Sequence, residues 1–493
     1  MKELLLGIDF GTGGCKGTLV SAAGKIITEH ACEYKTSHPQ AGWCEQNPDD
    51  WKKAMAEMLS VLLSGINPPD ISAIAFDGST HNAVLLDKNL AVLRPVIMWT
   101  DQRSSLEAEE LGKNHGTEIF SKTLALPSPT WTLPQMLWLH KNEPEILKKT
   151  SHILFVKDYM RFLLTGLMQT DYIEAQGTMF FLSKDRKWSG ELCRLGAVPF
   201  SALPEIINPA DICGKTTESA GEFNLPAGIP VVCGTSDSAA EAFSAGAVRP
   251  GQCILKLATA GNVNVITENA VPGEKTLTYS HPVPGLWYSV AATNSAAAAE
   301  RWLRDTFFSD YKADESWSVI DKEAALSPAG SGGIIFHPYL LGERSPYWDK
   351  NLRASFTGIS MRSGRGDFCR SLMEGVAFSL ADCFTVIKKL GLNPQEFRLI
   401  GGGSKSSVWP QIVADVFGKP LVLPASSSAS LGAAMLAGCG IKVFKDEISA
   451  AGLCVKEKNR IIPGENTENY QKIFKNYLAI HDALAPVYKN IFE

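Results

Sequence analysis

The chain has 493 residues and a net charge of −5 at neutral pH, with 45% hydrophobic and 20% charged residues. This is the composition of an ordinary globular protein, and it excludes disordered, collagen-like and disulfide-dense chains. Lys and Arg are scattered and no apolar run approaches the roughly 18 residues of a membrane span, so neither nucleic acid nor a membrane is an expected partner.

A Gly-rich turn between two expected strands opens the chain. The apolar residues 4–8 run into Asp9, the turn at 11–14 follows, and a second strand is expected at 16–20. Glycines in such a turn let backbone N–H groups approach an anion, and an aspartate at the strand end offers the oxygens that Mg²⁺ prefers. An ordinary Gly-rich hairpin is the alternative. The chain contains no Walker phosphate loop and no dinucleotide-binding fingerprint.

Strands and helices alternate through the first half. We expect strands at 71–76 and 83–86 and helices at 49–63 and 133–141. A further apolar strand at 229–233 leads into Gly-Thr-Ser-Asp237. A carboxylate at this place in an α/β protein is either a general base or the N-cap of the following helix.

The second half begins with the same strand–turn–strand pattern. The apolar residues 253–257 lead into the turn 258–261 and a strand at 262–266. The expected elements that follow are a helix at 366–390, a strand at 398–401, and helices at 406–417, 430–437 and 467–492. We therefore expect two related α/β domains with a boundary near 240–250.

Taken in order, these motifs resemble the FGGY carbohydrate kinases of the actin/hexokinase/Hsp70 ATPase superfamily. The matching segments span almost the whole chain; they include 7–12, 76–82, 94–103, 234–237, 338–346, 401–403 and 431–434. The resemblance implies two ribonuclease H-like α/β domains of the actin ATPase type with a deep cleft between them. Residues 1–245 would bind sugar and carry the first phosphate turn, and residues 246–493 would bind the nucleotide.

The resemblance also implies the reaction, in which the γ-phosphoryl group of ATP moves to a primary hydroxyl of a sugar. Asp237 would be the general base and Asp9 the residue that holds Mg²⁺. The implied phosphate contacts are Gly11, Thr12 and Gly13 in the first turn and Ala258, Thr259 and Gly261 in the second. The implied adenine contacts are Gly402, Gly403 and Ser406, and the implied sugar contacts are Thr80, His81, Asp101, Trp131 and Asp237.

Within the family, the motifs are most similar to those of xylulose kinases. Thr80 and His81 stand where glycerol kinases carry an Arg-Glu pair, and a neutral or donor imidazole suits a neutral sugar rich in hydroxyl and carbonyl groups. A ketopentose such as D-xylulose is therefore the expected substrate. Another ketose, a polyol or a sugar acid stays open, the last because Arg103 lies near in sequence. A non-catalytic sugar or nucleotide sensor is less favoured, because binding alone needs no base.

The chain departs from the family pattern at four places that bear on its chemistry. These are Ala258 before Thr259 in the second turn, Ser238 after Asp237, Gln135 in place of a Lys, and Glu174 in place of an Asp. Sugar and ATP are the expected partners, and a homodimer is compatible with the resemblance because many relatives are dimers. Eleven cysteines without a Cys-x-x-Cys pair indicate reduced thiols, so we expect a soluble, cytoplasmic protein.

Overall fold

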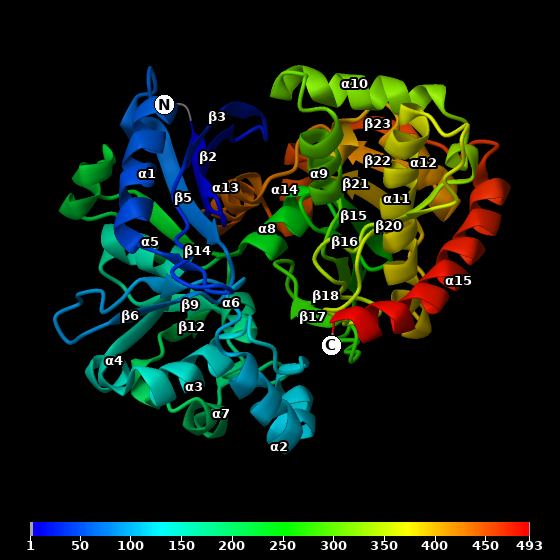
Figure 1. The fold of residues 1–493 in the computed structure, drawn as a ribbon. Coiled ribbons are helices and arrows are strands. Elements are labelled where there is room, and N and C mark those ends of the chain that lie inside the picture. Colours follow the sequence, from blue (N-terminus) through cyan, green and yellow to red (C-terminus); the bar gives the residue numbers. More distant parts are fainter. Residues whose placement is uncertain (1–2, 493) are drawn as a thin grey trace. The chain divides into compact units, whose positions relative to one another are not determined.

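The computed structural model describes residues 3–492, so the outermost ends of the predicted domains, residues 1 and 493, lie outside the described part (Figure 1). The chain forms two compact units. Unit 1 comprises the chain up to residue 248 together with residues 279–287 and 426–456. Unit 2 comprises residues 249–278, 288–425 and the chain from residue 457 onward.

Unit 1 is built on a six-stranded sheet in the order β13-β14-β5-β1-β2-β3. Its strands are β1 (Leu4–Phe10), β2 (Gly14–Ser21), β3 (Ile26–Glu33), β5 (Ile71–Gly78), β13 (Ile212–Lys215) and β14 (Pro230–Ser236). The first three strands form an antiparallel meander, and β5 and β14 continue it in parallel with β1. A near-continuous apolar run in β1 is typical of a strand covered on both faces.

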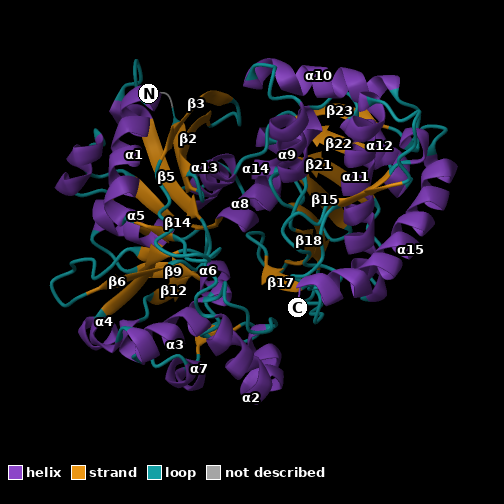
Figure 2. Ribbon diagram, in the orientation of Figure 1, coloured by secondary structure: helices purple, strands orange, loops and turns teal. Residues whose placement is uncertain are grey.

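Helices pack on both faces of this sheet, as Figure 2 shows. On one face lie α1 (Pro48–Leu62) and α5 (Val156–Thr165), and on the other lie α8 (Asp237–Ser244) and α13 (Ala429–Gly440). The start of α1 follows from its sequence, because the Asn47 side chain caps the N–H of Asp49 and Pro48 occupies the first turn. Its apolar stripe then buries Trp51 and Met55 against the sheet.

The remaining helices and strands complete unit 1. They are β4 (Glu45–Gln46), β6 (Ala83–Leu86), β7 (Val96–Ile97), α2 (Ser105–Thr123), α3 (Thr132–Asn142), α4 (Pro144–Lys149), β8 (His152–Phe155), β9 (Gln169–Asp171), α6 (Tyr172–Gly177), β10 (Phe181–Leu182), β11 (Lys187–Trp188), α7 (Gly190–Leu195), β12 (Glu205–Ile207) and α14 (Glu447–Cys454). Among them, β6 and α3 confirm the predicted strand at 83–86 and the predicted helix at 133–141.

Unit 2 has a seven-stranded sheet in the order β17-β18-β16-β15-β21-β22-β23. Its strands are β15 (Gln252–Leu257), β16 (Gly261–Thr267), β17 (Leu277–Ser280), β18 (Trp287–Thr293), β21 (Glu396–Ile400), β22 (Leu421–Pro424) and β23 (Glu457–Ile461). The order β18-β16-β15-β21-β22 repeats the order β3-β2-β1-β5-β14 of unit 1. This repetition confirms that the strand–turn–strand pattern at the start of each half marks two related domains.

The predicted helices of the second half are present. The helices of unit 2 are α9 (Ala297–Phe307), α10 (Ala313–Leu326), α11 (Arg365–Lys389), α12 (Trp409–Phe417) and α15 (Thr467–Phe492), and the small strands β19 (Ile335–His337) and β20 (Ser355–Thr357) pair beside them. Buried residues of α11 and α12 form one core with the inner strands. No helix in residues 3–492 combines the length and the apolar character needed to cross a membrane.

The division of the chain differs from the predicted domains 1–245 and 246–493. The first crossing lies at residue 248, close to the prediction, but residues 279–287 and 426–456 return to unit 1. The physical reason is α13, whose apolar residues cover the second face of the unit 1 sheet. Gly7 in β1 makes this contact close, because a Cβ there would lie 1.9 Å from the Ser430 oxygen.

We predict that Gly7→Ala lowers the stability of the protein by about 3 kcal/mol or more, because neither β1 nor α13 can yield to the added methyl without backbone movement. Gly112→Ala is the matched control, since Gly112 is exposed in α2 and a Cβ there meets nothing within 4 Å. That change is expected to be neutral or stabilising, by up to about 1 kcal/mol. Urea unfolding of both variants measures the difference, and equal midpoints would contradict the close contact.

Candidate functional site

Three carboxylates lie at the carboxyl ends of neighbouring parallel strands in unit 1. Asp9 in β1 is paired in register with Asp77 in β5, and Thr235 in β14 is paired with Asp77 on the other side. Asp237 follows two residues later at the first position of α8. Open α/β sheets place their sites at this edge, so the fold brings the two predicted catalytic aspartates to one location. Asp77 joins them, although the sequence analysis gave it no role.

Asp9 and Asp77 face each other in a buried setting. No N–H or hydroxyl group of the described residues donates to Oδ1 of Asp9 or to either oxygen of Asp77. Burial raises the pKa of Asp9 to about 7, and the negative charges of Asp237 and Glu241 add to the effect. Burial also raises the pKa of Asp77, to well above its usual range. Two negative charges in one buried site repel each other. The pair is stabilised when the two carboxylates share a proton, or when a cation binds between the carboxylates and a ligand.

The carboxylates of this site fit Mg²⁺ only if the nucleotide supplies further ligands to the ion. Among the described residues, no group of three or more His, Cys, Asp or Glu side chains is arranged to hold a metal ion. Magnesium commonly binds through one or two carboxylates, retained waters and substrate phosphates. Oδ1 of Asp9 is buried and accepts no hydrogen bond from the described residues, so this carboxylate oxygen is available as a ligand of Mg²⁺.

In the first Gly-rich turn the carbonyl groups are bonded by the protein, whereas the N–H groups of Thr12 and Gly13 are left for a ligand. The Tyr34 hydroxyl donates to the Gly11 carbonyl, Gln46 Nε2 donates to the Thr12 carbonyl at 2.7 Å, and the Tyr34 N–H donates to the Gly13 carbonyl at 3.3 Å. In the described chain no acceptor takes the N–H of Thr12 or of Gly13. A turn held in this way is preorganised for an anion such as a phosphate.

The predicted sugar contacts Thr80, His81 and Trp131 lie together beside Asp237. Thr80 Oγ1 donates to Asp237 Oδ1 at 3.2 Å. The ring of His81 lies 4.9 Å from the ring of Trp131, and Trp131 uses its own N–H on the Leu126 carbonyl. Burial lowers the pKa of His81 to about 3, so its imidazole is neutral at physiological pH.

Asp101, a predicted sugar contact, is engaged by groups of the protein itself, and its contact with sugar stays a prediction. Its two oxygens accept four hydrogen bonds, three from Arg103 and one from the Cys44 N–H. Four bonds occupy the acceptor capacity of a carboxylate. Arg103 is equally committed, because it also pairs with Glu45 at 2.8 Å and lies over the ring of Trp43. Neither side chain is more than 1% exposed.

The strand that leads to Asp237 is braced by buried charges. Lys157 Nζ lies 2.6 Å from Asp158 Oδ1 and 2.9 Å from Asp171 Oδ2, and all three side chains are fully buried. Arg161 also pairs with Asp158 and donates to the Cys233 carbonyl in β14. The opposite charges of Asp158 and Asp171 hold the pKa of Lys157 above its usual range, although burial alone would lower it. We call this set of five residues the brace: Lys157, Asp158, Arg161, Asp171 and Cys233.

Unit 2 gathers the predicted nucleotide contacts at the carboxyl ends of β15 and β21. The Ala258 carbonyl accepts the Ala297 N–H at 2.7 Å, and the Thr259 carbonyl accepts two N–H groups at the start of α9. Gly401 has φ +93°, and a Cβ there would lie 2.5 Å from the Leu257 oxygen. Gly402, by contrast, has open space at its Cβ position, which leaves a flat backbone face for a ring.

Ser406 is not part of this flat face. Its Oγ donates to Asp321 Oδ1 at 2.6 Å and accepts the N–H groups of Val408 and Trp409, so it caps α12. A hydroxyl has one proton and two lone pairs, and all three are used. Gly403 is buried against Leu257 and the Trp409 ring. The hydroxyl of Ser406 is therefore used within the protein, and a contact of Ser406 with adenine stays a prediction.

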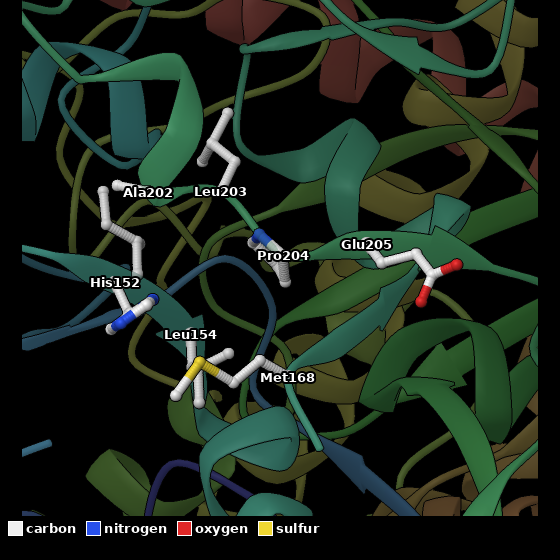
Figure 3. Close-up of a pocket in the computed structure, with 8 residues that line it drawn as sticks. His152, Leu154, Met168, Ala202, Leu203, Pro204 and Glu205 are labelled. Atoms are coloured by element: carbon white, nitrogen blue, oxygen red, sulfur yellow. The ribbon is translucent and has the colours of Figure 1, made fainter.

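A separate pocket of about 240 Å³ lies in unit 1 beside β8 and β12. Figure 3 shows its lining, in which Leu154, Met168 and Leu203 are apolar and His152 and Glu205 are polar. None of the predicted site residues lines it, and its few polar groups do not converge as those of a substrate site do.

Family models match both halves of the chain. The model of the N-terminal domain of the FGGY family of carbohydrate kinases matches residues 4–244, and that of the C-terminal domain matches residues 255–441. The chain therefore belongs to the FGGY family of carbohydrate kinases. It is an ATP-dependent sugar kinase with the two-domain, actin-like α/β fold of that family, as the sequence resemblance implied. The cleft between the domains stays a prediction.

Individual relatives cover the chain almost completely. The xylulose kinase of Staphylococcus xylosus is 31% identical over 97% of this chain and 99% of its own. A solved xylulose kinase from Rhodospirillum rubrum has a TM-score of 0.90 at 28% identity, covering 99% and 100% of the two chains. A solved gluconate kinase from Lactobacillus acidophilus has a TM-score of 0.92 at 26% identity and covers 100% of both chains.

We predict that Lys157→Met lowers the stability of unit 1 by about 3–5 kcal/mol, because it leaves Asp158 and Asp171 as buried charges without their shared cation. Lys148→Met is the control, since Lys148 pairs with Glu145 in an exposed ion pair at 2.7 Å. Removing that pair should change stability by less than about 1 kcal/mol. Urea unfolding of the two variants provides the comparison. Similar midpoints would show that the brace contributes no more to stability than an exposed ion pair.

Proposed function

We propose that this kinase phosphorylates a ketopentose such as xylulose on its terminal primary hydroxyl. The observation that carries the proposal is the contact between the uncharged ring of His81 and the ring of Trp131, next to Thr80 and its hydrogen bond to Asp237. A neutral imidazole and an indole face suit the hydroxyl groups and C–H faces of a neutral sugar. Similarity to the xylulose kinase of Staphylococcus xylosus over nearly the full length supports the same substrate class.

In the proposed reaction, Asp237 accepts the proton of the sugar hydroxyl while that oxygen attacks the γ-phosphorus of ATP. The bond between the γ-phosphorus and the bridging oxygen breaks, and ADP leaves. Phosphoryl transfer asks a protein mainly for positioning and for stabilisation of charge. Thr80 orients Asp237 through their hydrogen bond, and Ser238 adds a backbone N–H donor to the same oxygen at 2.6 Å.

The phosphate contacts of the proposal come from the two turns. The N–H groups of Thr12 and Gly13 cradle the transferring group, with Gly11 as the residue that closes the turn. Thr259, with Ala258 and Gly261, contributes the second turn, and Gly402 and Gly403 provide the face for adenine. Asp9 holds Mg²⁺ together with the nucleotide, and the ion supplies charge neutralisation at the phosphates.

Gluconate is the second candidate substrate, because a gluconate kinase has a closely similar structure. A sugar carboxylate would need a cationic partner such as an Arg fork. The two guanidinium groups that follow Thr80 and His81 in sequence are already paired, Arg94 with Glu45 and Glu143. Arg103 is paired with Asp101 and Glu45. The neutral sugar is favoured for this reason.

The proposal extends to location and assembly. All eleven cysteines are free and buried, which supports a reducing compartment such as the cytoplasm. A homodimer rests on the family resemblance alone.

Asp237→Asn is expected to lower kcat by about 10²–10⁴-fold while the fold and much of the substrate affinity persist. Asn keeps the acceptor oxygen for Thr80 and Ser238 but cannot take up the proton of the sugar hydroxyl. Asp211→Asn, at an exposed turn of the same unit, should leave kcat unchanged. Retention of more than about half of the wild-type kcat by Asp237→Asn would mean that another group is the base.

Values of kcat/KM for D-xylulose, L-xylulose, D-ribulose, glycerol, pentitols and gluconate test the substrate class. We expect a ketopentose to rank first, because the site offers neutral donors and an aromatic wall. A ketopentose rate more than about tenfold below that of gluconate or a polyol would overturn the proposed substrate. An ADP-coupled assay at saturating ATP provides the comparison.

A further inference from the structure

His81 has an unusual backbone conformation for a residue with a side chain. Its φ is +56°, in the left-handed region that favours glycine. A non-glycine residue stays there only when its surroundings hold it. His81 is also almost fully buried, and its Nδ1 has no hydrogen-bond partner among the described residues. The direction of this ring therefore depends on what fixes the two peptide groups around it.

Two buried side chains hold His81 from opposite sides. Glu174 Oε1 accepts the His81 N–H at 2.5 Å, and Thr132 Oγ1 donates to the His81 carbonyl at 2.6 Å. Glu174 and Thr132 come from α6 and α3 and are at most 1% exposed. Gly177 completes the fit, because a Cβ at that position would lie 2.8 Å from Thr80 Cγ2 and 2.9 Å from His81 Cδ2.

The helix that carries Glu174 is fixed to the strand that leads to Asp237. Asp171 caps α6 by accepting the N–H groups of Ile173 and Glu174, and the Thr235 hydroxyl of β14 donates to the same oxygen at 3.0 Å. Its other oxygen pairs with Lys157 of the brace. Glu174 is therefore a rigid link between the base-bearing strand and the histidine of the acceptor side.

We propose that Glu174 is a positioning residue for sugar recognition, which holds His81 in its left-handed conformation and so sets the direction of the imidazole toward the acceptor sugar. This inference rests on the proposed sugar site at Thr80, His81 and Asp237. Glu174 touches neither sugar nor nucleotide in this proposal; it acts through the backbone of His81. Its loss should weaken sugar binding and leave nucleotide binding unchanged.

The test compares Glu174→Leu, which removes the acceptor for the His81 N–H, with Glu174→Gln, which keeps an acceptor of the same reach. Burial raises the pKa of Glu174 well above its usual range, and Gln keeps the size of the side chain and an acceptor oxygen without its charge. We expect Glu174→Leu to lower kcat/KM for the preferred sugar about 10- to 100-fold, mainly through KM, as misplacement of a binding group does. KM for ATP should change by less than about threefold, and Glu174→Gln should restore the sugar KM to within about threefold of wild type.

Two further variants keep the result interpretable. Thr132→Val removes the second hold on His81 and should raise the sugar KM in the same direction, which decides the matter if Glu174→Leu does not fold. Glu107→Leu is the matched control, because Glu107 is a buried carboxylate of α2 that pairs with Lys141 and not with His81. Thermal shifts on adding sugar without ATP give a readout independent of turnover.

The inference is overturned if Glu174→Leu and Thr132→Val keep the wild-type sugar KM, or if both change the sugar and ATP KM equally and Glu107→Leu does the same. A wild-type protein that phosphorylates no sugar would instead contradict the proposed function. An active wild type with an unaffected Glu174→Leu variant contradicts this inference alone.

Discussion

The site in unit 1 depends on buried charge that is stable only when every member is paired. Lys157 forms ion pairs with both Asp158 and Asp171, and none of the three side chains is exposed. Removing one partner from such a set leaves a charge that the low-dielectric interior cannot solvate. Because Arg161 bonds the Cys233 carbonyl and Asp171 accepts from Thr235, the brace fixes β14 on both sides of Gly234. Gly234, at φ +76°, in turn lets β14 pass within contact of the Phe76 carbonyl, since a Cβ would lie 1.6 Å from that oxygen.

The two turns use one physical device with different parts. In unit 1, side chains from outside the turn donate to the carbonyl groups of Gly11 and Thr12. In unit 2, the first N–H groups of α9 do the same for the carbonyl groups of Ala258 and Thr259. In both cases the bonded carbonyl groups fix the peptide planes of the turn, which suits the proposed contact with an anion. Ala258 therefore does not disturb the turn through its carbonyl, which is held as firmly as that of Thr259.

The local parts of this site could be predicted from sequence, and the distant pairings could not. Asp9 ends the apolar run of β1 and Asp237 directly follows β14, so their position at a sheet edge follows from the pattern. Asp77 carries the same local signal, but its pairing with Asp9 comes from the parallel register of β1 and β5. Asp101 lies in a motif typical of a binding loop, yet Cys44 and Arg103 occupy its oxygens. The contact between His81 and Glu174 spans 93 residues and involves a change of backbone conformation, neither of which leaves a periodic signal. The return of α13 to unit 1 is equally invisible, because an all-apolar helix does not indicate which sheet it covers.

Two departures of this chain from the family pattern meet at the acceptor side. Ser238 donates both its N–H and its hydroxyl to Asp237 Oδ1, where an amide side chain would offer different hydrogen-bond geometry. Glu174, one methylene longer than Asp, reaches the N–H of His81. The Ala258 carbonyl accepts an N–H group at the start of α9, so the alanine is accommodated in the turn. Gln135 donates its side-chain N–H groups to the carbonyls of Met98 and Pro129. The substitutions that bear on chemistry therefore act on the base and on the histidine, the two groups closest to the acceptor hydroxyl in the proposed reaction. In the proposed reaction most contacts to the nucleotide are backbone groups, so changes at Ser238 and Glu174 are expected to affect the preference among sugars more than the use of ATP.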